Sequence, residues 1–237
     1  LAKKMAGRLC FTSLHCFRRF GRALLRPLFN QQYGPRRGGR LSKDLRRSLI
    51  SWIKKLVDEL YEPMPLGRVR RRLFELFTDA RSTPPRVAGV LMHDSMVYTA
   101  WDPDASTCQQ WSPRGDNQII CLELLAVVVS LLTFGASVSG SNVRVWIDNS
   151  AGEMQLARGS ARSGDHNKLV HIVWTLAAKF GVGLWIERVA SDWNVADEPS
   201  REVSYAMDIL RAQWMQPVTT RVLSDYWAEF TGSICSA

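Results

Sequence analysis

The chain has 237 residues, of which 46% are hydrophobic, so it can bury one full core with a smaller element beside it. Its formal net charge of +9 is divided unevenly. Residues 1–72 carry 19 Lys and Arg against 4 Asp and Glu, whereas residues 73–237 carry 12 against 18. An arginine-rich segment suits a polyanion, because neutralising phosphates releases counterions. Charge therefore favours nucleic acid as a partner and leaves open a solvated basic tail.

Membrane and secreted proteins are disfavoured. The longest apolar stretch, residues 119–135, is interrupted by Glu123 and is shorter than the roughly 20 residues a bilayer requires. We find no signal peptide and expect no membrane partner. The cysteines are odd in number and too widely spaced for a paired metal site, so we expect reduced thiols in an intracellular protein, in either cytoplasm or nucleus. These are Cys10, Cys16, Cys108, Cys121 and Cys235.

The basic segment is expected to be helical. Apolar residues recur at helical spacing among the arginines of residues 1–29, which predicts one or two amphipathic helices. The Gly- and Pro-rich residues 33–40 are typical of an exposed linker. Ser42 then predicts an N-cap, with a helix running toward Pro63. The chain begins with Leu1 and not Met, which hints at a fragment of a longer polyprotein.

From Leu73 the periodicity changes to that of an α/β domain. The order predicts a mixed sheet with helices on both faces. A helix-like pattern closes the chain at residues 203–215. We divide the chain into a basic helical segment (1–72), an α/β domain (73–201) and a helical extension or linker (202–237). The predicted strands are 73–79, 87–92, 96–101, 143–148 and 184–189, and the predicted helices are 117–134, 151–157 and 165–180.

Four carboxylates are candidates for chemistry: Asp79, Glu123, Asp148 and Asp197. Asp79 and Asp148 each end a predicted buried strand, where open α/β sheets place ligands. Glu123 lies in a helix that is apolar nearly all round, and buried carboxylates need a partner or a metal. Glu123 could instead pair with an arginine or lie at an exposed helix start. Four carboxylates suit two Mg²⁺ ions about 4 Å apart, which can promote phosphodiester hydrolysis.

Four sequence blocks carry a family resemblance. They are Phe77-Thr-Asp-Ala80, Cys121-Leu-Glu-Leu-Leu-Ala126, Val145-Trp-Ile-Asp-Asn-Ser150 and Asn194-Val-Ala-Asp-Glu-Pro-Ser-Arg201. In this order they resemble the catalytic blocks of the ribonuclease H family. The last block, N-x-A-D-x-x-S-R, is most similar to reverse transcriptases of LTR-like and DIRS-type retrotransposons. Residues 6–9 and 20–28 also resemble the region that follows the polymerase palm in such elements, which would make residues 1–72 thumb- or connection-like.

The resemblance implies a ribonuclease H-like fold with a five-stranded mixed sheet, three antiparallel strands and then two parallel ones, flanked by helices, plus the basic N-terminal appendage. It implies a two-metal endonuclease that cuts the RNA strand of RNA–DNA hybrids within a reverse transcriptase polyprotein. Asp79 and Asp148 would bind both ions or the scissile phosphate, and Glu123 and Asp197 would complete one site each. The ions would be Mg²⁺, with Mn²⁺ as a substitute.

Nucleic-acid contacts are expected from two sets of residues. Asn149, Ser150 and Gln118 are candidates for contacts to RNA 2′-hydroxyls, which distinguish RNA from DNA. Helix capping by Asn149 or Ser150 is an equally good interpretation. The basic segment would contact phosphates through Arg18, Arg19, Arg22, Arg36 and Arg37.

The sequence departs from the family in one loop. Some members carry a His before the last Asp to aid product release, whereas Ser191-Asp192-Trp193 occupies that loop here, which implies altered turnover. We expect His166 at the surface and Asp165 and Asp192 solvated. No Y-x-D-D polymerase motif is present, so this chain alone should not synthesise DNA.

Two alternatives to a hybrid nuclease remain. One is a catalytically silent connection module that keeps the fold and binds template–primer. The other is a structure-specific DNA nuclease, because a fold does not determine its substrate. The four carboxylates favour a nuclease, since a binding module gains nothing from negative charges beside a phosphate backbone.

Overall fold

The computed structural model describes residues 2–15, 19, 21–33, 41–57, 71–113, 115 and 118–219. Most of the expected linker (34–40), the predicted helix beyond Val57 and residues 220–237 lie outside this part of the chain.

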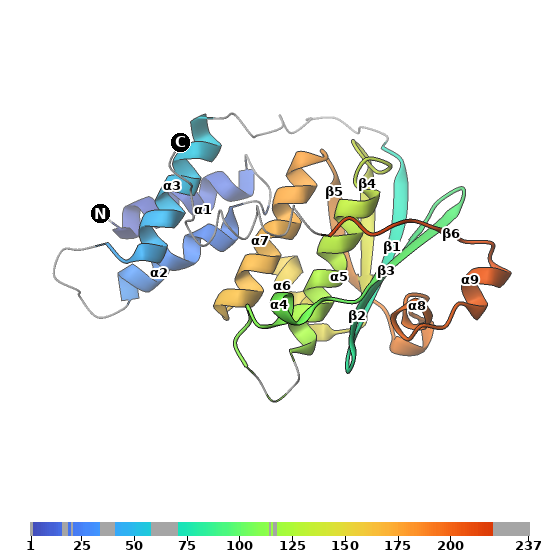
Figure 1. The fold of residues 1–237 in the computed structure, drawn as a ribbon. Helices are drawn as coiled ribbons and strands as arrows, with labels where there is room; N and C mark the ends of the chain where they lie inside the picture. Colours follow the sequence, from blue (N-terminus) through green and yellow to red (C-terminus); the bar gives the residue numbers. More distant parts are fainter. Residues whose placement is uncertain are drawn as a thin grey trace, which may run out of the picture.

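A six-stranded mixed sheet forms the centre of the molecule, in the order β5-β4-β1-β2-β3-β6 (Figure 1). β1 to β3 are antiparallel, while β4 and β5 run parallel to β1. These five strands confirm the predicted arrangement of three antiparallel strands and two parallel ones. The strands are β1 (Leu73–Ser82), β2 (Pro85–Met92), β3 (Met96–Trp101), β4 (Asn142–Ile147), β5 (Gly183–Arg188) and β6 (Gln213–Trp214).

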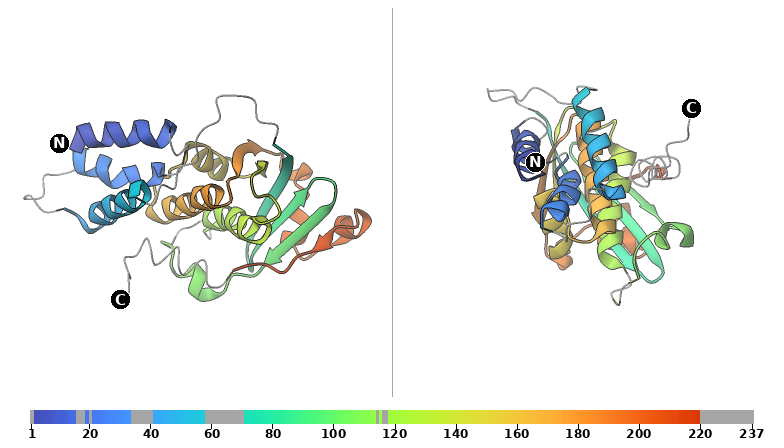
Figure 2. Two further views of the ribbon diagram at one scale, coloured as in Figure 1. Left: turned by 90° about the horizontal axis from the view of Figure 1, so that it is seen from above. Right: turned by 90° about the vertical axis from the view of Figure 1, so that its left-hand side faces the viewer.

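Helices cover both faces of the sheet, as predicted. On one face α5 (Ile119–Phe134) packs across β1 and β2 and against α7 (Gly164–Lys179), with α6 (Ser150–Arg158) beside β5. The opposite face carries α8 (Asp197–Ser200) and α9 (Tyr205–Ile209), as seen from above in Figure 2. Two short helices, α4 (Ala105–Cys108) and η2 (Ser191–Trp193), lie in loops. No helix in the described ranges is long and apolar enough to cross a membrane.

Close packing between α5 and β2 depends on Gly89. A Cβ atom at this position would overlap the hydroxyl of Ser130 on α5. Thus α5 can approach β2 this closely at Ser130 because β2 has no side chain at position 89. This contact fixes α5, and with it Glu123, over the strands.

The C-terminal part differs from its predicted structure. Helix is found only at α9, and Gln213 and Trp214 then pair in parallel with Val97 and Tyr98 of β3. A strand of two residues is too short to show a periodic pattern in the sequence. The rings of Trp214 and Tyr98 pack edge to face across this pairing, with their centres 5.3 Å apart. The sheet therefore has a sixth strand that periodicity did not predict.

The basic segment folds into α1 (Ala2–His15), η1 (Arg22–Leu25), α2 (Arg26–Tyr33) and α3 (Lys43–Val57), with Ser42 accepting a hydrogen bond from the Leu45 N–H at 3.2 Å as an N-cap. These helices lie beside α7 (Figures 1 and 2). Leu24, Leu28 and Trp52 are buried in the same hydrophobic cluster as the residues of α5 and β1. The appendage and the α/β domain therefore share one continuous core.

Candidate metal centre

Parallel pairing of β1 and β4 brings two aspartates together. The ladder ends where Thr78 meets Ile147, so Asp79 and Asp148 are the next residues on neighbouring strands. β4 stops there, but β1 continues to Ser82, with Asp79 opposite Ala88 of β2. Asp79 therefore does not end its strand as expected. It is the first residue of β1 beyond the end of its pairing with β4.

Glu123 enters the same place from the second turn of α5. Its side chain is 4% exposed, and its carboxylate accepts a hydrogen bond from the Ala80 backbone N–H. Neither of the expected alternatives is found: it pairs with no arginine in the described part of the chain and is not at an exposed helix start. Its Oε2 atom is buried without a hydrogen-bond partner. Such an oxygen is stabilised either by a proton or by a cation.

The three carboxylates form one group. Asp79, Glu123 and Asp148 each offer an oxygen, and these oxygens all lie within 4.8 Å of one another. Burial, together with the charges of Asp148 and Asp197, raises the pKa of Asp79 to about 6. The pKa of Glu123 lies well above its usual value because of burial, and then because of Asp79 and Asp148. Oxygen ligands with uncompensated negative charge fit a hard divalent cation such as Mg²⁺.

Asp197 takes a different position from the other three. It is the first residue of α8. Its Oδ1 accepts a hydrogen bond from Nε of Arg201 at 2.8 Å and lies 2.7 Å from Nη2 of the same guanidinium in an ion pair. It does not belong to the 4.8 Å group, although its charge contributes to the raised pKa of Asp79. The structure therefore brings three of the four expected carboxylates together and places Asp197 beside them in an ion pair.

Two further residues of the closing block support Asp79. Ser200 is fully buried and donates its hydroxyl to Oδ2 of Asp79, which lowers the pKa of that carboxyl against the effect of burial. Asn194 donates to the Thr78 carbonyl at 3.0 Å and to Oδ1 of Asp79 at 3.4 Å. Sequence reasoning assigned no role to either side chain, although both stand at fixed positions of the N-x-A-D-x-x-S-R pattern. That pattern was the signal that could have identified them.

The loop before α8 contacts the second aspartate. Ser191 donates its hydroxyl to Oδ2 of Asp148 at 2.9 Å. Asp192 is exposed, as expected, and Trp193 is 78% exposed beside it. The loop before α8 therefore contacts Asp148 through a serine hydroxyl.

The residues expected to contact RNA lie at the starts of helices. Asn149 caps α6, because its Oδ1 accepts hydrogen bonds from the N–H groups of Ala151 and Gly152, both at 3.0 Å. The capping interpretation of Asn149 is thereby confirmed. Ser150 opens α6, and Gln118 precedes α5 with a left-handed backbone, φ 63°. A role of these side chains in binding RNA stays a prediction.

Few of the expected phosphate-binding arginines fall in the described part of the chain. Arg18, Arg36 and Arg37 lie outside it. The guanidinium of Arg19 lies 5.5 Å from the centre of the Trp174 ring on α7, and burial, then Arg22, lowers its pKa. Arg19 thus contributes to docking of the appendage, and its contact to phosphate stays a prediction, as does that of Arg22.

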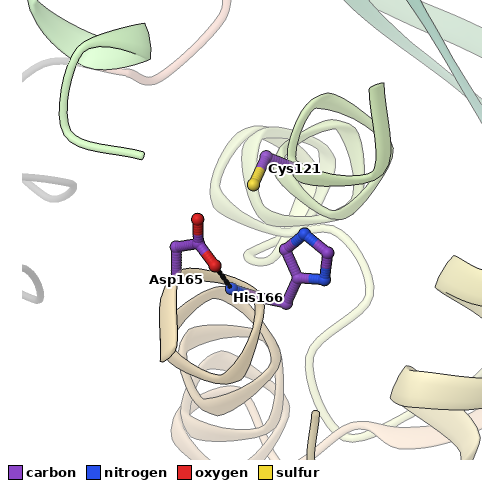
Figure 3. A group of neighbouring side chains, drawn as sticks. All are labelled: Cys121, Asp165 and His166. Atoms are coloured by element: carbon purple, nitrogen blue, oxygen red, sulfur yellow. Dashed lines mark hydrogen bonds between the residues drawn. The ribbon is translucent and has the colours of Figure 1, made fainter. Parts of the chain in front are cut away.

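A second group with metal-binding side chains lies between α5 and α7: Cys121, Asp165 and His166 (Figure 3). His166 and Asp165 are buried, contrary to the surface positions expected for them, because α7 starts under the loop that precedes α5. Both Asp165 oxygens already accept hydrogen bonds, Oδ1 from Ser163 and the His166 N–H, and Oδ2 from the Ser112 N–H at 3.0 Å. These bonds join the start of α7 to the loop at Ser112, so we assign the carboxylate a structural role.

Neither the protein-family models nor the curated proteins contain a match to this chain. Among solved structures, it is similar to RNase H1 from the halophilic archaeon Halobacterium salinarum, with a TM-score of 0.43 and 15% identity over 58% of this chain and 99% of that one. It is also similar to an N-terminal RNase H domain from Mycobacterium tuberculosis, with a TM-score of 0.41 and 17% identity over 59% of this chain and 96% of the other. At this level of similarity the reaction must be judged from the side chains of the site.

Proposed function

We propose that the chain is a divalent-metal-dependent endonuclease that hydrolyses the RNA strand of RNA–DNA hybrids. The observation that supports it most is the group of Asp79, Glu123 and Asp148, whose oxygens lie within 4.8 Å of one another; Asp79 and Glu123 are buried and Asp148 is half-buried. A module that only binds nucleic acid has no use for this charge beside phosphates.

Asp79, Glu123 and Asp148 would hold the metal, with Asp197 completing the site on one side. When bound, Mg²⁺ or Mn²⁺ supplies activation of water and stabilisation of the leaving oxygen. The protein keeps the ligands in place: Ser200 and Asn194 hold Asp79, Ser191 holds Asp148, and the Ala80 N–H holds Glu123. Such supporting hydrogen bonds orient metal ligands and tune their basicity.

The reverse transcriptase setting is part of the proposal. It is supported by the closing sequence block, by the resemblance of residues 6–9 and 20–28, and by the charge of residues 1–72. A longer open reading frame with a polymerase motif upstream of Leu1 in the genomic sequence would support it, and a terminator directly upstream would contradict it.

The activity is tested with a labelled RNA–DNA hybrid in Mg²⁺ or Mn²⁺, beside RNA and DNA duplexes, for the wild type and Asp148→Asn. We expect cleavage of the hybrid's RNA strand alone, lost by at least a hundredfold in the variant, which is the usual effect of removing a transition-state contact. Hybrid binding without cleavage would favour the silent module, and cleavage of DNA would favour the alternative nuclease.

Metal binding can be tested without activity. Mg²⁺ should raise the melting temperature of the wild type, because a ligand that binds only the folded state stabilises it. The increase should be smaller in Asp79→Asn and unchanged in Asp192→Asn, whose side chain is exposed. Equal increases in all three proteins would contradict the assigned ligands.

A further inference from the structure

A cavity of about 670 Å³ lies between the basic appendage and the α/β domain, away from the three carboxylates. Its walls come from η1, α2, α3 with Ser42 before it, and the start of α7 with Arg162 before it. This volume is in the range of cavities that hold small ligands. The appendage therefore forms one side of a site whose other side belongs to the domain.

Positive charge dominates the lining. Arg26, Arg47, Arg162 and Lys168 come from three different segments and line the same space. Among the described lining residues Asp44 is the sole acid, and its carboxylate lies at the edge, 3.8 Å from Arg47 and largely exposed. Of these, Arg26, Arg47 and Arg162 alone exceed the single charge of Asp44, and they repel one another unless an anion joins them. The lining thus fits a ligand with more than one negative charge.

Buried hydrogen bonds hold the walls in place. Asn167 of α7 is 6% exposed, donates to the Ala23 carbonyl at 2.9 Å and accepts from the Ala161 N–H at 3.0 Å. Ser48 of α3 donates to the Leu24 carbonyl. The bond from Asn167 to Ala23 joins the domain to the appendage, and the other two bonds hold the walls within each part. The cavity is therefore preformed, which lowers the cost of binding.

The cavity and the carboxylates lie toward the same end of the sheet. β4 and β5 are parallel, and Asp148 follows the end of β4. Only three residues, 180–182, separate the last turn of α7 from the start of β5. α7 must therefore begin toward the end of the sheet where β4 and β5 finish (Figure 1). A strand of nucleic acid can extend from one site toward the other along this end of the molecule.

We propose that this cavity binds the sugar–phosphate backbone of a nucleic-acid strand. Tyr33, 79% exposed at its rim, offers an aromatic face for a base, which favours nucleic acid over an acidic peptide. The inference rests on the proposed function only for the class of ligand. It adds a second contact area, formed jointly by the appendage and the domain, that holds the substrate while the carboxylates act on it.

The test measures binding without cleavage. The protein is the full chain carrying Asp148→Asn, in EDTA, and the probe is a labelled RNA–DNA hybrid with a single-stranded extension, followed by fluorescence anisotropy. Arg26→Gln/Arg162→Gln should weaken binding about tenfold or more at low salt and reduce the slope of log K against log [salt] by about 2, since each cation on a phosphate contributes about 1. Asp44→Asn should tighten binding.

The matched control is Arg8→Gln/Arg46→Gln, which removes two exposed cations of the appendage outside the cavity. It should weaken binding much less. Arg26→Lys/Arg162→Lys keeps the charge and should bind the hybrid nearly as tightly as the Asp148→Asn protein with both arginines. This comparison distinguishes the effect of lost charge from that of a disturbed fold. Equal weakening by the cavity and control pairs, or none in either, would overturn the inference.

Competitors identify the source of the negative charge. Unlabelled oligonucleotide should displace the probe far more effectively than inorganic phosphate, a mononucleotide or a polyglutamate of matched charge. A backbone site is excluded if a mononucleotide or polyglutamate displaces the probe as effectively as the oligonucleotide does, and if this displacement requires Arg26 and Arg162. If the wild type cleaves the hybrid but the cavity substitutions do not change binding, this inference alone is wrong. If the cavity substitutions weaken binding but the wild type cleaves nothing, only the proposed nuclease activity is wrong.

Discussion

The ionised Asp79 side chain destabilises the metal-free protein at neutral pH, because burial removes water from it and Asp148 and Asp197 add negative charge nearby. Its pKa of about 6 in the folded protein exceeds the usual 3.8, so between these values the folded state binds more protons than the unfolded one. The free energy of unfolding therefore falls as pH rises through this window, by up to about 3 kcal/mol for this group.

Asp79→Asn should remove this cost while keeping an acceptor for the Ser200 hydroxyl. We expect the variant to be more stable than the wild type in EDTA at pH 7.5 and about equally stable near pH 4, as measured by urea unfolding. Asp192→Asn, at an exposed position, should leave the pH dependence unchanged. A variant that is no more stable than the wild type at pH 7.5 would contradict the assigned burial and repulsion.

Ser200→Ala should raise the pKa of Asp79 above about 6, because the hydroxyl stabilises the charged form. A hydrogen bond to a charged group contributes enough for a shift of roughly one unit. The measurement is a carboxyl ¹³C NMR titration of the metal-free protein. Ser204→Ala, which removes a hydroxyl bonded to Asp208 at an exposed site, is the control and should leave Asp79 unchanged. An unshifted Asp79 would show that Ser200 does not tune it.

Residue types and their order were enough to nominate Asp79, Glu123 and Asp148. A carboxylate at the end of an apolar run stands out because burying it alone is costly. The supporting roles of Asn194 and Ser200 were not visible, since their partner Asp79 lies more than 100 residues away in the chain. Likewise, the pairing of Asp197 with Arg201 depends on the short turn of α8.

At the scale of elements, α5 connects the fold to the site. Its apolar sequence predicted a buried helix, but the position of Glu123 depends on how closely the helix approaches β2. That distance is set by Gly89, which faces Ser130 and, beyond it, Phe134.

Gly89→Ala should destabilise the protein by about 1–3 kcal/mol, because the added methyl overlaps the Ser130 hydroxyl and the core cannot expand without strain. Nuclease activity should fall as well if α5 moves Glu123. Adding Ser130→Ala should restore part of the stability, since that hydroxyl is buried without a hydrogen-bond partner. Gly7→Ala, where nothing lies within 4 Å, is the control and should be neutral or slightly stabilising in urea unfolding. No loss in Gly89→Ala would contradict the close packing.

Element boundaries followed the sequence most closely where periodicity was strong. The strand at Met96–Trp101 was predicted with the bounds it has, and α5 and α7 were predicted to within two residues at each end. Periodicity failed for β6, a two-residue strand that exists because β3 offers it an open edge.

For the molecule as a whole, the shared core predicts cooperative unfolding. Trp52 of α3 is 2% exposed and packs over Gly21, within a hydrophobic cluster that continues to α5 and the sheet. Trp52→Ala should therefore lower the stability of the entire chain by about 3–5 kcal/mol in a single calorimetric transition.

Ile53→Ala, at a side chain 60% exposed, should change stability by less than about 0.5 kcal/mol. Two separate transitions, with the one of the α/β domain unaffected by Trp52→Ala, would instead show that residues 1–72 fold as an independent unit. The boundary predicted at residue 72 is decided by the same measurement.

The sequence by itself determined the α/β class, the order of the first five strands and the nomination of the carboxylates, because these depend on local periodicity and on the cost of burying charge. Only the tertiary structure decided which carboxylates meet, since this follows from the register of β1 with β4 and the approach of α5 to Gly89. It also decided that the basic segment docks on α7 and encloses a cationic cavity. Contacts between residues far apart in the chain leave no trace in local patterns, because their energy arises only once the core has formed.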